Sequence, residues 1–148
     1  MDTEIFGKPI EILLVEDNPG DARLALECFK ESKIRNTIYW KQNGVEAMKF
    51  LQQQDTNISR LRADLILLDL NMPMMDGMEV LAKIKSDEAL KRIPVIIFTI
   101  SKADEHILKA YNLRANCYIT KPIDLNKFMM VIRSIEEFWL TTVRLPEE

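Results

Sequence analysis

The sequence is poor in the residues that build thiolate metal sites, disulfide frameworks and histidine-dependent catalytic centres. Its 148 residues include two cysteines and one histidine. Cys28 and Cys117 do not form a CxxC pair, and His106 has no second histidine with which to complete a zinc site. We therefore interpret the cysteines as buried reduced thiols, and a zinc enzyme or a histidine-based triad is disfavoured.

Long apolar runs and a strong charge bias are missing as well. No run approaches the length of a membrane span, and the N-terminal MDTEIFGKPI has two acids and no apolar stretch of signal-peptide length. The 20 basic and 23 acidic residues leave a net charge of -3, without a basic run or stripe. These absences predict a cytoplasmic protein that binds neither membranes nor nucleic acids.

What the sequence does contain is a regular alternation of two patterns. Short apolar runs, typical of buried strands, alternate with segments whose apolar residues recur at helical spacing, such as Gly77, Val80, Leu81 and Ile84. We expect strands over residues 10–15, 37–42, 64–69, 94–99 and 116–120. Such an alternation predicts a doubly wound α/β fold, (βα)5, around a parallel sheet.

One domain accounts for the whole length. We expect a core over about residues 9–135 and a C-terminal helix and tail over 136–148, with no output domain.

Polar residues gather where the predicted strands end. Glu16 and Asp17 follow the first strand, Asp69 ends the third, Thr99 ends the fourth and Lys121 follows the fifth. Ligands of such sheets bind outside the carboxyl ends of the strands. Each residue alone has an ordinary explanation as a helix cap, a strand residue or a turn residue. Three acids, a hydroxyl and a lysine on one rim are better explained as a site.

The three acids at this rim favour a bound cation. Two carboxylates about 4 Å apart repel by roughly 4 kcal/mol at an effective dielectric constant of about 20. Their pKa values must therefore rise, or a cation must bind. Oxygen ligands without sulfur or imidazole suit Mg²⁺ or Mn²⁺. A metal and a lysine beside a central carboxylate predict a phosphoryl-transfer site.

Four segments, in this order, resemble the receiver domains of two-component response regulators. They are LLVEDN, LLDLNMPMMDG, FTIS and YITKP, and the resemblance covers nearly the whole chain. It implies a flavodoxin-like fold with a five-stranded sheet in the order 2-1-3-4-5. It also implies a phosphorelay protein that assists its own phosphorylation and dephosphorylation, rather than an enzyme with a separate substrate.

The resemblance also implies a role for each residue of the rim. Asp69 would accept a phosphoryl group from a histidine kinase, and Lys121 would bond a phosphoryl oxygen. Glu16, Asp17 and Asp69, with the backbone carbonyl of Asn71, would hold the Mg²⁺ or Mn²⁺ ion.

Two further residues match the switch positions of the family. Thr99 would reach a phosphoryl oxygen, and Tyr118 matches the aromatic residue that turns inward as the hydroxyl moves. The bond from Lys121 to Pro122 is often cis in these domains. Ile100 departs from the pattern, because the residue after the switch hydroxyl is usually small. Its branched side chain predicts slower reaction of Asp69 with small phosphodonors and with water.

The C-terminal segment has more apolar residues than one buried helix face requires. Phe128, Val131, Ile132, Ile135 and Trp139 form one stripe, whereas Met129, Met130 and Leu140 fall about 100° or more away from it. A fraying tail with stray apolar residues is one interpretation. We favour a homodimer with Phe138, Trp139 and Leu140 at the interface.

The segments FWLTTVRLP and NCYITKP, with the longer loop before the third strand, are similar to single-domain regulators that serve phytochrome-type histidine kinases. This similarity implies a light-sensing kinase as the partner.

Three alternatives compete with this interpretation. A phosphatase of the haloacid dehalogenase type needs a second acid two residues after the nucleophile, where this chain has Asn71. A flavodoxin needs a hydroxyl-rich loop after the first strand, and VEDNPGD is acidic. The third alternative is a receiver-like module that binds partners without being phosphorylated.

Overall fold

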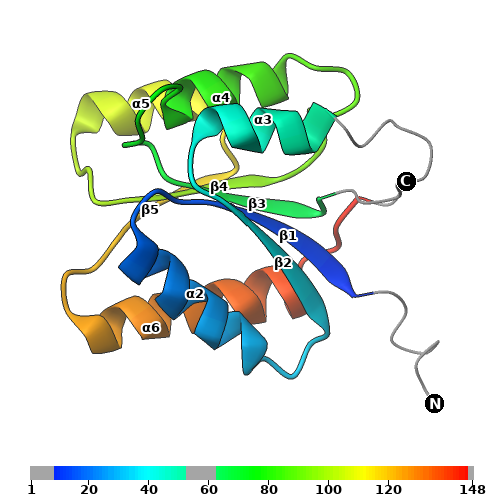
Figure 1. Cartoon of the computed structure of the whole chain (residues 1–148), viewed down its shortest axis with the longest axis vertical. Helices are drawn as coiled ribbons and strands as arrows, with labels where there is room; N and C mark the ends of the chain where they lie inside the picture. Colours follow the sequence, from blue (N-terminus) through cyan, green and yellow to red (C-terminus); the bar gives the residue numbers. More distant parts are fainter. Residues whose placement is uncertain (1–8, 53–62, 147–148) are drawn as a thin grey trace.

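The computed structural model describes residues 9–52 and 63–146 (Figure 1). The five strands are β1 (Ile10–Val15), β2 (Asn36–Lys41), β3 (Leu65–Leu68), β4 (Val95–Thr99) and β5 (Cys117–Thr120). They pair in parallel in the order β2-β1-β3-β4-β5, which confirms the predicted fold. The predicted strand ends differ from the observed ends by no more than one residue.

Helices cover both faces of the sheet. They are α2 (Pro19–Lys30), α3 (Gly44–Gln52), α4 (Gly77–Lys85), α5 (Asp104–Asn112) and α6 (Leu125–Glu137), and α6 continues into a π-helical turn, η2 (Phe138–Thr142). Figure 1 shows α3, α4 and α5 on one face and α2 and α6 on the other. The four apolar residues predicted to form one face of α4 are its buried residues.

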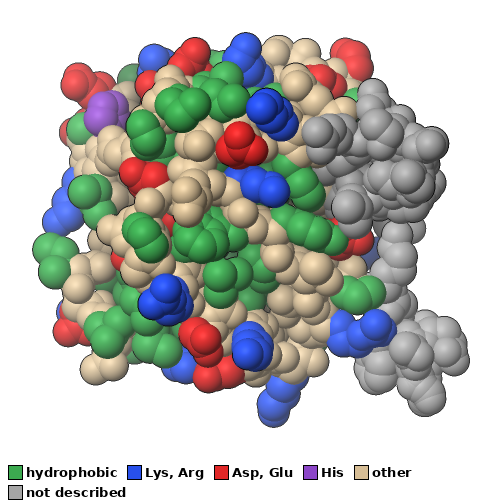
Figure 2. Space-filling model, viewed as in Figure 1, with side chains coloured by type: hydrophobic (Ala, Val, Ile, Leu, Met, Phe, Trp, Pro, Cys, Tyr) green, Lys and Arg blue, Asp and Glu red, His purple; other side chains and the backbone are tan. Residues whose placement is uncertain are grey.

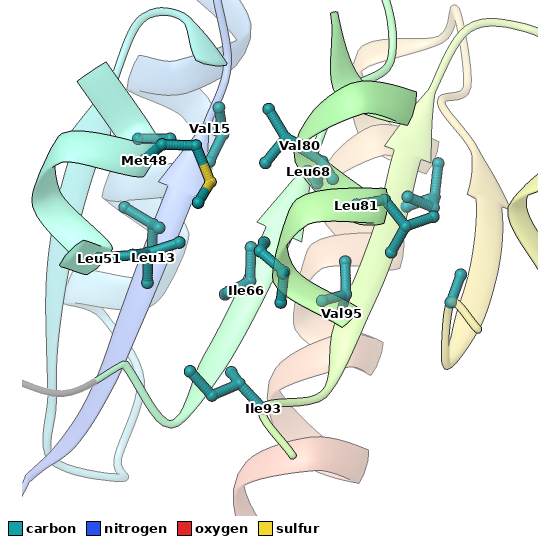
Figure 3. Close-up of a cluster of buried hydrophobic side chains, with 14 of the residues drawn as sticks. Leu13, Val15, Met48, Leu51, Ile66, Leu68, Val80, Leu81, Ile93 and Val95 are labelled. Carbon is teal, nitrogen blue, oxygen red and sulfur yellow. The ribbon is translucent and has the colours of Figure 1, made fainter. Parts of the chain in front are cut away.

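The third strand lies at the centre of the sheet and divides the core into two layers. All four of its residues are completely buried, as expected for a parallel strand covered on both faces. Ile66 and Leu68 belong to the core under α3 and α4, which Figure 3 shows. Leu65 and Leu67 point the other way, into the core under α2 and α6. This burial fixes the height at which the next residue, Asp69, leaves the sheet.

Two glycines bring backbone segments into direct contact beside the strand ends. A Cβ atom on Gly77, at the start of α4, would lie 2.2 Å from the carbonyl oxygen of Asp69. A Cβ atom on Gly44, at the start of α3, would lie 2.4 Å from the carbonyl oxygen of Met75. Since real side chains do not approach backbone so closely, these two helix starts require glycine.

The C-terminal turn corrects one part of the sequence interpretation. Leu140, predicted to face a partner, is buried at 7 % exposure in the core under α2 and α6. The N–H group of Val143 donates to the carbonyl of Phe138, five residues earlier. This π-type bond widens the turn and rotates Leu140 back toward the protein. Trp139 is partly buried against the same core, and Phe138 is 53 % exposed.

The surface agrees with the balanced charge of the sequence. Figure 2 shows acidic and basic side chains interspersed over one face of the molecule, with apolar groups between them. Among the helices in the described ranges, none combines the length and the apolar character required to cross a membrane.

Candidate functional site

The structure brings the predicted acids together at the carboxyl ends of the strands. Glu16 and Asp17 directly follow β1, and Asp69 directly follows β3, its immediate neighbour in the sheet. Carboxylate oxygens of the three residues lie within 4.8 Å of one another. Glu16 and Asp69 are buried, whereas Asp17 is exposed. The cluster therefore opens to solvent on the side of Asp17.

Lys121 lies in the same cluster, and it contacts one acid that the sequence analysis did not assign to the site. Its Nζ atom is 2.8 Å from Glu16 Oε1, 2.8 Å from Asp21 Oδ2 and 3.4 Å from Asp69 Oδ2. Asp21 lies in the first turn of α2, where an acid is also explained by the helix dipole. Nothing in the spacing of residues along the sequence indicates that the Asp21 carboxylate contacts Lys121, the residue that follows β5.

Burial and the contacts of Lys121 together shift the pKa values of Lys121 and Glu16. Burial lowers the pKa of Lys121, but its hydrogen bonds to Asp21 and Glu16, together with the negative charges of Glu16 and Asp69, outweigh burial and raise that pKa to about 12. Burial raises the pKa of Glu16 to about 7, although the hydrogen bond from Lys121 opposes this rise and the charge of Asp69 adds to it. The ammonium group is thus charged at neutral pH, and the acids around it outnumber it.

The donor set fits a divalent cation. Three carboxylates with closely spaced oxygens are hard ligands, and Asp17 leaves room for the water molecules that Mg²⁺ retains. The N–H group of Asn71 donates to Asp69 Oδ1 at 3.3 Å. The proposed ligation by the Asn71 carbonyl stays a prediction.

Neighbouring groups fix the position of Glu16. The indole nitrogen of Trp40, on β2, donates to the backbone carbonyl of Glu16 at 2.8 Å. The N–H group of Asn18 donates to Glu16 Oε2 at 3.1 Å. Asn18 also caps α2, since its side chain accepts from the N–H group of Asp21. The role of Trp40 was missed, because the sequence shows only an aromatic residue in an edge strand.

The predicted switch residues lie beside this cluster on β4 and β5. Thr99 is completely buried, and its Oγ1 atom accepts a 3.5 Å hydrogen bond from the side-chain amide of Asn71. Tyr118 is partly buried, and its hydroxyl donates to the carbonyl of Ser101 at 2.9 Å. The described residues contain no cis peptide bond, so the bond after Lys121 is trans, unlike the common family geometry.

Comparison with known proteins identifies the family. The model of the response regulator receiver domain matches residues 12–133, and this chain belongs to that family. It is a two-component response regulator whose acidic cluster is of the kind that binds a divalent cation. The phosphatase and flavodoxin alternatives are thereby excluded.

Among individual proteins, the chain is homologous to response regulator Rcp1 of Synechocystis. The two are 46% identical over 138 residues, which cover 93% of this chain and 94% of Rcp1. The probable methanogenesis regulatory protein FilR2 of Methanothrix harundinacea is 36% identical over 138 residues, covering 93% of this chain and 88% of FilR2.

Two solved structures are similar over almost the whole chain. The phosphorylated cyanobacterial phytochrome response regulator RcpA has a TM-score of 0.89 and 46% identity, covering 95% of this chain and 100% of RcpA. The Mn²⁺-bound form of Rcp1 also has a TM-score of 0.89 and 46% identity, covering 94% of this chain and 100% of Rcp1.

Proposed function

We propose that Asp69 accepts a phosphoryl group from a histidine kinase, and that the phosphorylated chain signals through altered protein contacts. The observation that carries this proposal is the environment of Asp69. Its buried carboxylate lies 3.4 Å from a buried ammonium group and within 4.8 Å of two further acids. In this proposal the chain is a phosphoacceptor that assists its own phosphorylation and dephosphorylation and does not turn over a separate substrate.

The chemistry follows from these positions. A carboxylate oxygen of Asp69 attacks phosphorus while the P–N bond of the kinase phosphohistidine breaks. The histidine nitrogen keeps the electron pair of that bond, and an acyl phosphate remains on Asp69. Lys121 offsets the negative charge of the transferred oxygens, which is the main demand of phosphoryl transfer.

Glu16, Asp17 and Asp69, with the carbonyl of Asn71, would hold Mg²⁺ or Mn²⁺ at this site. When bound, the cation supplies positive charge to the phosphoryl oxygens. The donor set supports this assignment, and so does the similarity to Rcp1, whose structure is known in a Mn²⁺-bound form.

The switch begins at Thr99, whose hydroxyl moves to a phosphoryl oxygen once the acyl phosphate forms. Because Thr99 is joined to the loop that carries Ser101, this movement changes the acceptor of the Tyr118 hydroxyl. The phosphate thus biases the chain between two conformations.

The partner we propose is a phytochrome-type histidine kinase in the cytoplasm. The support is the similarity to RcpA, a cyanobacterial phytochrome response regulator, over 95% of this chain. We further propose a homodimer through Phe138 and Trp139, next to each other at the end of the last helix, with ring centroids 5.8 Å apart.

Intact mass spectrometry tests the phosphoacceptor role. The chain is incubated with Mg²⁺ and acetyl phosphate, or with a phosphorylated phytochrome-type kinase. We expect the wild type to gain one phosphoryl group and Asp69→Ala to gain none. Asp104→Ala, which removes an exposed acid from α5, is the matched control and reacts like the wild type. A wild type that gains no phosphoryl group from either donor would favour the module that acts without phosphorylation.

A further inference from the structure

Asp21 binds the lysine of the site more closely than the phosphoacceptor does. Its Oδ2 atom lies 2.8 Å from Lys121 Nζ, against 3.4 Å for Asp69 Oδ2. The position of Asp21 is fixed at its backbone, where the N–H group donates to the side chain of Asn18. Asn18 in turn donates to Glu16. One capping residue therefore bonds both acidic residues whose carboxylates lie 2.8 Å from the ammonium group, Asp21 at its backbone and Glu16 at its carboxylate.

Stabilisation of the helix dipole alone does not account for this contact. An acid in the first turn of a helix serves the dipole while it remains in solvent. The side chain of Asp21 is 27% exposed, and its partner, the side chain of Lys121, is 4% exposed. The carboxylate therefore turns inward, toward the site.

The ammonium group of Lys121 has only three N–H donors. In this structure Glu16, Asp21 and Asp69 match these donors in number, and the two closest partners are not the phosphoacceptor. A phosphoryl oxygen that binds Lys121 must therefore draw the ammonium away from these acids or share it with them.

We propose that Asp21 is a positioning residue that holds Lys121 back from the incoming phosphoryl group and so attenuates phosphorylation of Asp69. This inference rests on the proposed phosphoacceptor function. Asp21 acts in two ways, and both slow the phosphorylation of Asp69. It occupies a donor of Lys121, and it adds one negative charge to a site that an anionic phosphodonor must enter.

Loss of the Asp21 charge leaves Lys121 in place, because Glu16 still holds its ammonium group at 2.8 Å. The expected effect of Asp21→Asn is therefore a gain in rate. A partly exposed carboxylate contributes a modest charge interaction, so we expect phosphorylation by acetyl phosphate to become about three- to fivefold faster. The advantage shrinks as salt is added, since salt screens a charge that is open to solvent.

The experiment compares initial rates of phosphoryl incorporation, read by intact mass at saturating Mg²⁺, for four proteins. They are the wild type, Asp21→Asn, Asp21→Glu and Glu27→Gln. Asp21→Glu keeps the charge and should return the rate toward that of the wild type. Glu27→Gln removes an exposed acid from the same helix and controls for net charge, so it should react like the wild type. Thermal unfolding curves establish that all four are folded.

The inference is overturned if folded Asp21→Asn reacts at the wild-type rate or more slowly, or if Glu27→Gln accelerates the reaction equally. It is also overturned if added salt leaves the ratio of the Asp21→Asn rate to the wild-type rate unchanged. These results are distinct from failure of the proposed function, in which the wild type itself would gain no phosphoryl group.

Discussion

The indole N–H group of Trp40 donates a 2.8 Å hydrogen bond to the backbone carbonyl of Glu16. An edge strand thereby fixes the first acid of the acidic cluster, and the N–H group of Glu16 donates in return to the carbonyl of Lys41 on the same strand. Groups that orient a ligand in this way contribute to metal affinity without touching the metal.

Replacing Trp40 by Phe should therefore weaken Mg²⁺ binding. The ring is retained while the donor is lost, and we expect the Mg²⁺ dissociation constant to rise about three- to tenfold. Calorimetric titration of the unphosphorylated protein measures it. Trp139→Phe, in the C-terminal turn on the core under α2 and α6, is the matched control and should bind Mg²⁺ like the wild type. Equal affinity of Trp40→Phe and the control would show that the bond is not needed for metal binding.

Glu136 predicts a pH dependence of stability that is independent of the site. Its Oε2 atom is buried and has no hydrogen-bond partner within the described residues. Burial raises the pKa of Glu136 to about 7, although the charge of Arg133 opposes the rise. The folded state therefore holds the proton of Glu136 more tightly than the unfolded state does. The free energy that this proton contributes to folding is fully present below about pH 4.5 and is lost as the pH rises through 7.

Glu136→Gln should remove this part of the pH dependence. Between pH 5 and pH 8 the wild type should lose on the order of 1–3 kcal/mol of unfolding free energy that the variant does not lose. Urea unfolding at the two pH values measures the difference. Glu27→Gln, which removes an exposed acid from α2, should follow the wild type. Parallel pH curves for Glu136→Gln and the wild type would contradict the assignment.

We expect the side chain of Ile100 to lengthen the lifetime of the acyl phosphate on Asp69. The side chain follows Thr99 at the carboxyl end of β4 and is 65 % exposed. From this position we expect it to restrict the access of water and small phosphodonors to Asp69. Ile100→Ala should widen this access and shorten the half-life of the phosphorylated protein about two- to fivefold. Decay of the phosphorylated mass in buffer with Mg²⁺ measures it. Leu108→Ala, at a similarly exposed position on α5, should leave the half-life unchanged. An unchanged half-life in Ile100→Ala would exclude this role.

We expect Phe138 to contribute strongly to the affinity of the proposed homodimer. It is the large apolar residue of the C-terminal turn that remains exposed, since Leu140 is buried in its own chain. Phe138→Ser should raise the dimer dissociation constant about tenfold or more, because an aromatic anchor is lost from the interface. Sedimentation over a range of concentrations measures the constant, with and without phosphorylation. Met130→Ala, on the exposed side of α6, should have little effect, and a wild type that stays monomeric throughout would refute the dimer.

The sequence predicted the residues that the sheet itself positions. Asp69 and Glu16 follow neighbouring parallel strands, so the topology alone brings them to one rim. The contacts of Asp21 and Trp40 depend instead on side-chain direction and on how α2 and β2 lie against the strand ends, which apolar spacing does not encode. Leu140 was misassigned because helical spacing assumes a regular α-helix, and a π-type bond changes the rotation of the turn.

Gly77 and Gly44 give the site a stiff mechanical connection to the helices on one face. At Gly77 the start of α4 lies against the peptide of Asp69. At Gly44 the start of α3 lies against the carbonyl of Met75, which belongs to the loop between β3 and α4. No side chain separates these backbones, so no layer of rotatable atoms can absorb a displacement there. A shift of the Asp69 peptide therefore acts directly on the start of α4, and a shift of the Met75 carbonyl acts directly on the start of α3. A larger residue at either glycine would force these backbones apart.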